Sequence, residues 1–86
     1  MATMNGLTSD LDSLERLMRW IAPRTIGRAT ALERLEDLKM AAPDRHHLQD
    51  AACPLARALE KLLPQSAVIS LARRRLRDMV VMLADP

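Results

Sequence analysis

The sequence has few of the residues on which several classes of protein depend. Among its 86 residues there is one cysteine, one tryptophan and no phenylalanine or tyrosine. A single cysteine forms no intramolecular disulfide, so we expect the chain in the reducing bacterial or eukaryotic cytosol, as a cytoplasmic protein. The scarcity of aromatic side chains also argues against a protein that binds single-stranded nucleic acid, because such proteins stack unpaired bases on aromatic rings.

Long apolar runs are missing as well. No segment approaches the roughly 20 apolar residues that a membrane-spanning helix needs. Residues 1–7 have neither the basic region nor the apolar region of a signal peptide. We therefore expect no membrane span and no Sec-type export.

The residues that are present favour helices. Hydrophobic residues make up 49% of the chain and charged residues 28%, which is ordinary for a globular domain. The apolar residues are mainly Leu, Ala and Met, which favour helix over strand. The sequence predicts one all-α domain over residues 1–86, with 1–7 flexible. So short a chain buries a small core, which makes a partner or self-association reasonable.

Helical periodicity predicts a bundle of three to four short amphipathic helices with antiparallel neighbours. The first is expected to begin at Thr8 or Ser9 and to stop before Pro23. Thr30 and Glu33 have the spacing of a capping box, which predicts a second helix over about 30–42. The apolar stripes of these two helices are Leu7, Leu11, Leu14, Met18 and Ile21, then Ala31, Leu35, Leu38 and Ala42.

The second half of the chain also has the periodicity of amphipathic helices. Asp44 is a suitable N-cap, and the apolar phase continues through Pro54, which removes a backbone donor. One kinked helix or two successive helices both fit, and the continuous phase favours the kink. Residues 64–66 separate this segment from a last helix that runs nearly to the C-terminus. The apolar positions are Leu48, Ala51, Ala52, Leu55, Leu59, Leu62 and Leu63, then Ile69, Ala72, Leu76, Met79, Val80 and Leu83.

Some apolar side chains lie beside these stripes and form a candidate partner-binding set. Trp20 lies about 120 degrees from the centre of its helix's core face, at 100 degrees per residue. Tryptophan often dominates protein interfaces, but Trp20 fits the edge of the core equally well. The predicted partner-binding residues are Leu17, Trp20, Val68, Leu71, Val81 and Met82.

The one dense charge cluster consists of Arg73, Arg74, Arg75 and Arg77. Arginine forks pair well with phosphate oxygens, so nucleic-acid binding is an alternative function. The net charge of only +2 and the near-absence of aromatic residues weaken the nucleic-acid alternative. The four side chains also spread around the helix. The apolar stripe and basic flanks of the same helix also fit an anionic membrane surface, but the helix has no Trp or Phe to anchor there.

His46, Asp50 and Cys53 share one helix face at i, i+4 and i+7 and could each ligate zinc. No second cysteine exists, and a convex helix surface offers no cleft for a Cys–His nucleophile. A polar surface with one free thiol is the simpler interpretation. We therefore predict no metal ligand, no cofactor and no catalytic residue.

These observations favour a non-catalytic protein–protein interaction module, such as an adaptor, a chaperone-like protein or a regulator. It is expected to bind a protein partner, or itself as a dimer, through an apolar helix face. The alternative is a nucleic-acid-binding regulator that uses the arginine cluster. A bundle enzyme with inward-pointing arginines is a distant third, because the apolar stripes contain no charged residue.

Overall fold

The computed structural model of the chain describes residues 2–41 and 44–84, and the side chains of 9–41, 44 and 46–82. It contains four helices: α1 (Ala2–Arg19), α2 (Arg28–Ala41), α3 (Arg45–Glu60) and α4 (Ala67–Ala84). In the described part of the chain the only strand-like feature is one isolated bridge, between Ile26 and Leu63. The predicted all-α class is confirmed.

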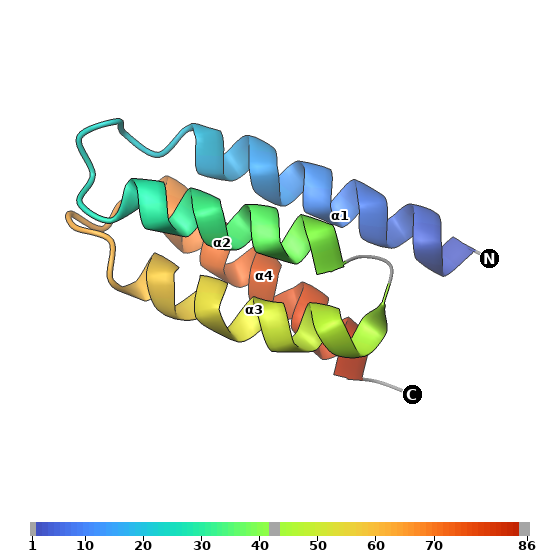
Figure 1. Cartoon of the computed structure of the whole chain (residues 1–86). Coiled ribbons are helices and arrows are strands. Elements are labelled where there is room, and N and C mark those ends of the chain that lie inside the picture. Colours follow the sequence, from blue (N-terminus) through green and yellow to red (C-terminus); the bar gives the residue numbers. More distant parts are fainter. Residues whose placement is uncertain (1, 42–43, 85–86) are drawn as a thin grey trace.

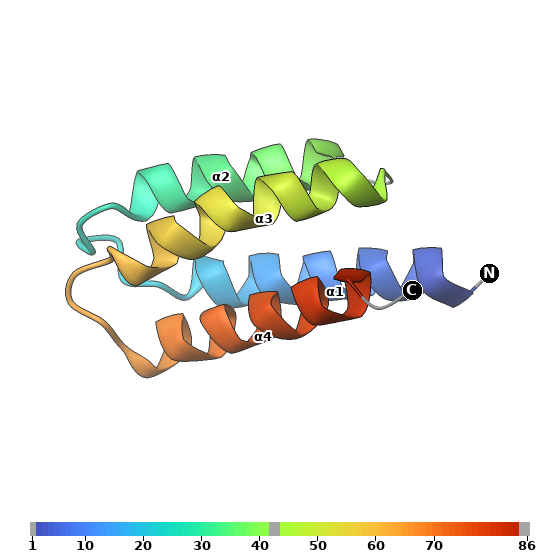
Figure 2. The ribbon, with the colours of Figure 1, turned by 90° about the horizontal axis from the view of Figure 1, so that it is seen from below.

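The four helices form an elongated bundle of 39 × 19 × 18 Å in which neighbours are antiparallel (Figure 1). Figure 2 shows two layers, one made by α2 and α3 and the other by α1 and α4. Helix α2 packs closely on α3, and α4 contacts both α1 and α3, whereas α1 and α2 touch at few places. Within the described residues, no helix has the length and hydropathy to cross a membrane.

The core lies between the two layers and takes its side chains from the predicted stripes. Spacing of three and four residues places these side chains on one face of each helix. The buried hydrophobic residues are Leu11, Leu14, Met18, Ile21, Ala31, Leu35, Leu38, Leu48, Ala52, Leu55, Leu59, Leu62, Ile69, Ala72, Leu76 and Met79.

A few stripe positions differ from the prediction. Leu63 is 57% exposed, because it follows the end of α3 and no longer obeys the helical phase. Ala51 and Val80 are only partly buried against the core. The side chains of Leu7 and Leu83, and all of Ala42, lie outside the described residues.

The first two helices begin earlier than the sequence predicts. Helix α1 begins at Ala2 and not at Thr8 or Ser9, so the backbone of 2–7 is helical. Met1 lies outside the described residues, and the flexibility of 1–7 stays a prediction. Helix α2 begins at Arg28, which makes the predicted capping box wrong.

Gly27 sets the true start of α2. Its carbonyl oxygen accepts the Ala31 N–H at 3.0 Å, and its φ of 90° lies in the left-handed region that glycine adopts readily. The chain therefore turns into the helix before it reaches Thr30. Thr30 and Glu33 lie within the helix and are exposed.

The last two helices begin close to where they were predicted. The Asp44 Oδ1 accepts the N–H groups of His46 at 2.9 Å and His47 at 3.2 Å, which confirms Asp44 as an N-cap. Ser66 precedes α4, and its Oγ accepts the Ile69 N–H at 3.4 Å. Helix α3 continues through Pro54 as one helix, so two successive helices are excluded, and the predicted kink is not confirmed.

The α1–α2 and α3–α4 connections are joined at one end of the bundle (left in Figure 1). The Ile26 N–H donates to the Leu63 carbonyl oxygen at 2.8 Å, and the Leu63 N–H donates back to Ile26 at 3.3 Å. The Arg28 Nε donates to the Ile21 carbonyl oxygen at 3.0 Å. These bonds satisfy backbone groups of the two connections, which have no partner within a helix.

Candidate protein-binding face

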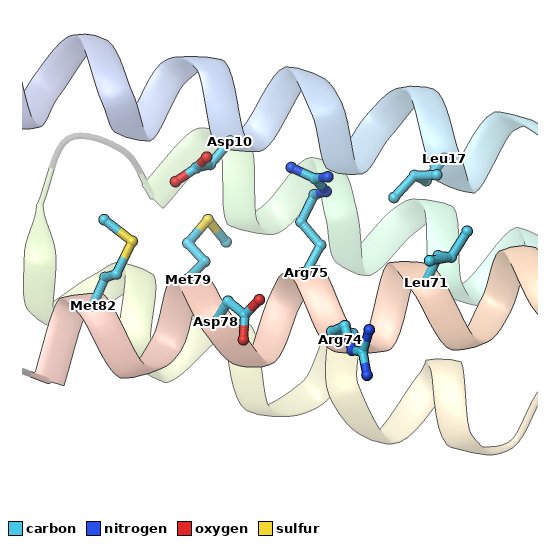
Figure 3. Close-up of a pocket in the computed structure, with 8 residues that line it drawn as sticks. All are labelled: Asp10, Leu17, Leu71, Arg74, Arg75, Asp78, Met79 and Met82. Atoms are coloured by element: carbon cyan, nitrogen blue, oxygen red, sulfur yellow. The ribbon is translucent and has the colours of Figure 1, made fainter.

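A shallow groove of about 290 Å³ runs along the seam between α1 and α4, and we call it the α1–α4 groove (Figure 3). It exists because each helix turns its core stripe inward and leaves the flanking positions on both sides of the seam open. Leu71 is 51% exposed and Met82 is 64% exposed. The lining residues are Asp10 and Leu17 of α1, and Leu71, Arg74, Arg75, Asp78, Met79 and Met82 of α4.

The chemistry of this groove changes along its length. Because α1 and α4 are antiparallel, the C-terminal part of α4 lies beside the N-terminal part of α1. In Figure 3, Met82 lies at one end and is followed by the two acids, Asp10 and Asp78, and then by the two arginines. Leu17 and Leu71 face each other at the other end. The order is apolar, acidic, basic, apolar.

The charges in the α1–α4 groove are not used inside the molecule. Arg74 and Arg75 form no ion pair with any residue that the structure describes, and the same holds for Asp10 and Asp78. Arg73, by contrast, lies 3.8 Å from a Glu60 carboxylate oxygen. The unpaired charges keep their hydrogen-bonding capacity for another molecule.

The hollow between α1 and α2 is different, because two of its lining residues, Glu15 and Arg19, pair with each other, and Glu15 also pairs with Lys39 of α2. The Lys39 Nζ lies 3.2 Å from the Glu15 Oε1, and Arg19 donates to the Glu15 Oε2 at 3.2 Å. Hydrogen bonds from Lys39 and then Arg19 lower the pKa of Glu15, and the bond to Glu15 raises the pKa of Lys39. The Glu15 and Arg19 charges of this hollow are therefore already paired, whereas Glu33, which also lines it, forms no ion pair with a described residue.

The structure divides the predicted partner-binding set among several places. Leu17, Leu71 and Met82 meet in the α1–α4 groove. Val81 lies in a second groove between α3 and α4, together with Cys53. Val68 is half-buried against the core. The predicted set is thus not one continuous surface.

Trp20 lies at the end of α1, outside the α1–α4 groove, and is 79% exposed. It is therefore not an edge residue of the core, which was one of its two interpretations. It lies just past the last turn of α1, where its N–H donates to the Leu17 carbonyl oxygen at 3.0 Å. Trp20 is available to extend a contact that begins in the α1–α4 groove.

The arginine cluster is also divided between two faces. Arg73 and Arg77 line the α3–α4 groove, and Arg74 and Arg75 line the α1–α4 groove. The sequence indicated this spread, because four neighbouring helical positions cannot share one side. No single basic surface results from the cluster.

Sequence reasoning missed the two acids of the α1–α4 groove. Asp78 follows Arg74 by four positions, and this spacing is a signal that could have placed both on one side of α4. Asp10 gives no such signal, because its position beside α4 depends on how the helices pack. Three exposed apolar residues away from the groove, Ile26, Met40 and Leu63, were also not anticipated as surface residues.

His46, Asp50 and Cys53 are exposed on α3, as expected for a polar surface. In the described part of the chain, no three His, Cys, Asp or Glu side chains come close enough together to hold a metal ion.

Comparisons of this chain with protein-family models, with curated proteins and with solved structures found no match.

Proposed function

We propose that this protein is a non-catalytic interaction module that binds a protein, either a different chain or a copy of itself, through the α1–α4 groove. One observation carries the proposal: exposed apolar side chains and unpaired arginines lie together in one groove between two helices of 18 residues each. Adaptor, chaperone-like and regulatory roles, in the cytoplasm, all fit such a module.

The energetics of protein interfaces support this function. Burial of Leu71 and Met82 would remove apolar surface from water, which stabilises a complex by roughly 25 cal/mol per Å². Arginine is enriched in protein interfaces, whereas most other charged residues are depleted. Arg74 and Arg75 could orient a partner without losing an intramolecular ion pair.

The test uses two matched double variants and the wild type, each tagged and purified from the protein's own host. Leu71→Gln with Met82→Gln changes the α1–α4 groove, and Met40→Gln with Leu63→Gln changes two exposed apolar side chains outside it. All four side chains are exposed, and Met40, Leu71 and Met82 lie in helices, where glutamine is well tolerated, so both variants should fold.

In nuclease-treated lysate at moderate salt, a protein retained stoichiometrically by the wild type and by the second variant should be lost from the groove variant. Mass spectrometry identifies the retained proteins. Identical retention by all three tagged proteins would contradict the proposed function.

Nucleic-acid binding is the second candidate, and the free guanidinium groups of Arg74 and Arg75 favour it. Two phosphate contacts predict a log–log salt slope of about −1.8 on duplex DNA, and all four arginines predict about −3.6. Filter-binding titrations measure this slope. Binding that ignores salt, or no binding at low salt, would exclude this candidate.

A further inference from the structure

We infer that the occupant of the α1–α4 groove is a second copy of this chain. The two copies are related by a two-fold axis that lies in the plane of the interface and is perpendicular to the long direction of the groove. This inference rests on the proposed function and names its partner. It is carried by the order of chemical groups along the groove (Figure 3).

A two-fold rotation reverses that order in the second copy. The sequence apolar, acidic, basic, apolar then lies against apolar, basic, acidic, apolar. Asp10 and Asp78 of each copy would face Arg74 and Arg75 of the other, and the Met82 end would cover the end formed by Leu17 and Leu71. Closed two-fold dimers need a self-complementary surface of this kind.

The free charges make this pairing favourable. Arg74 and Arg75 have no carboxylate partner among the described residues, so dimerisation breaks no ion pair. Each guanidinium can donate two hydrogen bonds to one carboxylate. A groove with charges of only one sign would repel its copy, whereas this groove has two acids and two arginines at separate positions.

The size of the face limits the area that the contact can bury. An 18-residue helix is about 27 Å long at 1.5 Å per residue. Two such helices side by side present a projected face of roughly 500 Å² if each is about 10 Å wide. Standard interfaces bury about 800 Å² per partner. We therefore expect a reversible dimer whose population rises with protein concentration.

Charge reversal tests the pairing directly. The acidic variant contains Arg74→Glu and Arg75→Glu, and the basic variant contains Asp10→Lys and Asp78→Lys. In a dimer of either variant alone, like charges would face each other. In an equimolar mixture, every facing pair would have opposite charges.

Sedimentation equilibrium at low salt should give the wild type about twice its 9.6 kDa mass. Each variant alone should remain monomeric, and the mixture should return to the dimer mass. A single chain that carries all four substitutions should also dimerise. This fourfold variant keeps the test informative even if one of the double variants folds poorly.

The matched control is Arg57→Glu with Lys61→Glu, which makes the same charge change at exposed positions at the end of α3. It should dimerise like the wild type. Far-ultraviolet circular dichroism confirms that every variant is folded.

Three results would overturn the inference: a wild type that stays monomeric at millimolar concentration, double variants that dimerise as well as the wild type, or a mixture that does not dimerise. A monomeric wild type whose host partner is lost from the Leu71→Gln, Met82→Gln variant would overturn only the identity of the partner. The proposed function fails separately, when retention from lysate is the same for all three tagged proteins.

Discussion

The Glu15 carboxylate of α1 accepts hydrogen bonds from the Lys39 ammonium of α2, with the Nζ atom 3.2 Å from both carboxylate oxygens. Helices α1 and α2 touch at few other places, so this ion pair is a principal link between the two layers on that side. Arg19 donates to the same carboxylate from within α1.

The Glu15–Lys39 pair predicts a pH dependence of stability. The bonds from Lys39 and Arg19 lower the pKa of Glu15 below its usual value of 4.5. A carboxylate with a lowered pKa in the folded state contributes stability above its unfolded-state value and loses it as the pH falls through the folded-state value. Glu15→Gln should therefore lower the melting temperature near neutral pH, and this difference from the wild type should disappear in acid.

Thermal unfolding followed by circular dichroism across the acidic range measures this effect. Glu33→Gln is the control, because Glu33 is exposed on α2 and forms no ion pair with the described residues. It should melt like the wild type at every pH. A Glu15→Gln difference that stays constant from neutral pH into acid contradicts the assigned role of the pair.

Gly27 predicts a backbone effect on stability. A Cβ atom at this position would lie 3.3 Å from the Leu62 Cδ2, and the φ of 90° is unfavourable for any residue with a side chain. Gly27→Ala should therefore lower the free energy of unfolding by about 1–2 kcal/mol. Urea unfolding measures the change.

The other glycine provides the comparison. Gly6 lies within α1, where alanine is the better helix former. Gly6→Ala should leave stability unchanged or raise it by up to about 1 kcal/mol. Equal effects of the two substitutions would show that the backbone at Gly27 is not strained by a side chain.

The exposure of Trp20 predicts that its substitution affects partner binding more than the free energy of unfolding. It is 79% exposed, so Trp20→Ser should change the free energy of unfolding by no more than about 0.5 kcal/mol. Leu14→Ser removes a fully buried side chain and should cost at least about 2 kcal/mol. Because Trp20 is the one tryptophan and there is no tyrosine, intrinsic fluorescence reports its surroundings alone.

Partner binding should change the Trp20 emission, and Trp20→Ser should weaken binding more than folding. Fluorescence titration of the wild type with its partner measures the first effect. Because Trp20→Ser has no tryptophan, sedimentation equilibrium measures its binding and circular dichroism during urea unfolding measures its stability. If Trp20→Ser unfolds the protein while the remaining folded fraction binds normally, Trp20 is a structural residue.

The inward side of each helix could be predicted because helical periodicity is a local property. Leu14, Leu55 and Leu76 repeat with their neighbours at three and four positions, and all three are buried. Asp44 as an N-cap is equally local, because its side chain binds the N–H groups of the next residues. The spread of the arginines around α4 follows from the same geometry.

Features that depend on contacts between residues far apart in the sequence could not be predicted from local periodicity. The start of α2 depends on Gly27 and on the bridge between Ile26 and Leu63, so the local capping pattern at Thr30 was misleading. Leu63 continued an apolar stripe in the sequence, but its place in the connection exposes it.

The all-α class and the core-facing side of each helix thus follow from the order of the amino acids, because both depend on interactions within a few residues. Which helix faces lie side by side depends on how the four helices pack. This packing brought Asp10 of α1 into the same groove as Arg75 of α4 and left the charges of that groove without partners among the described residues. Helix packing is driven by burial of apolar surface from all four helices together, and no pattern within a single helix contains this information.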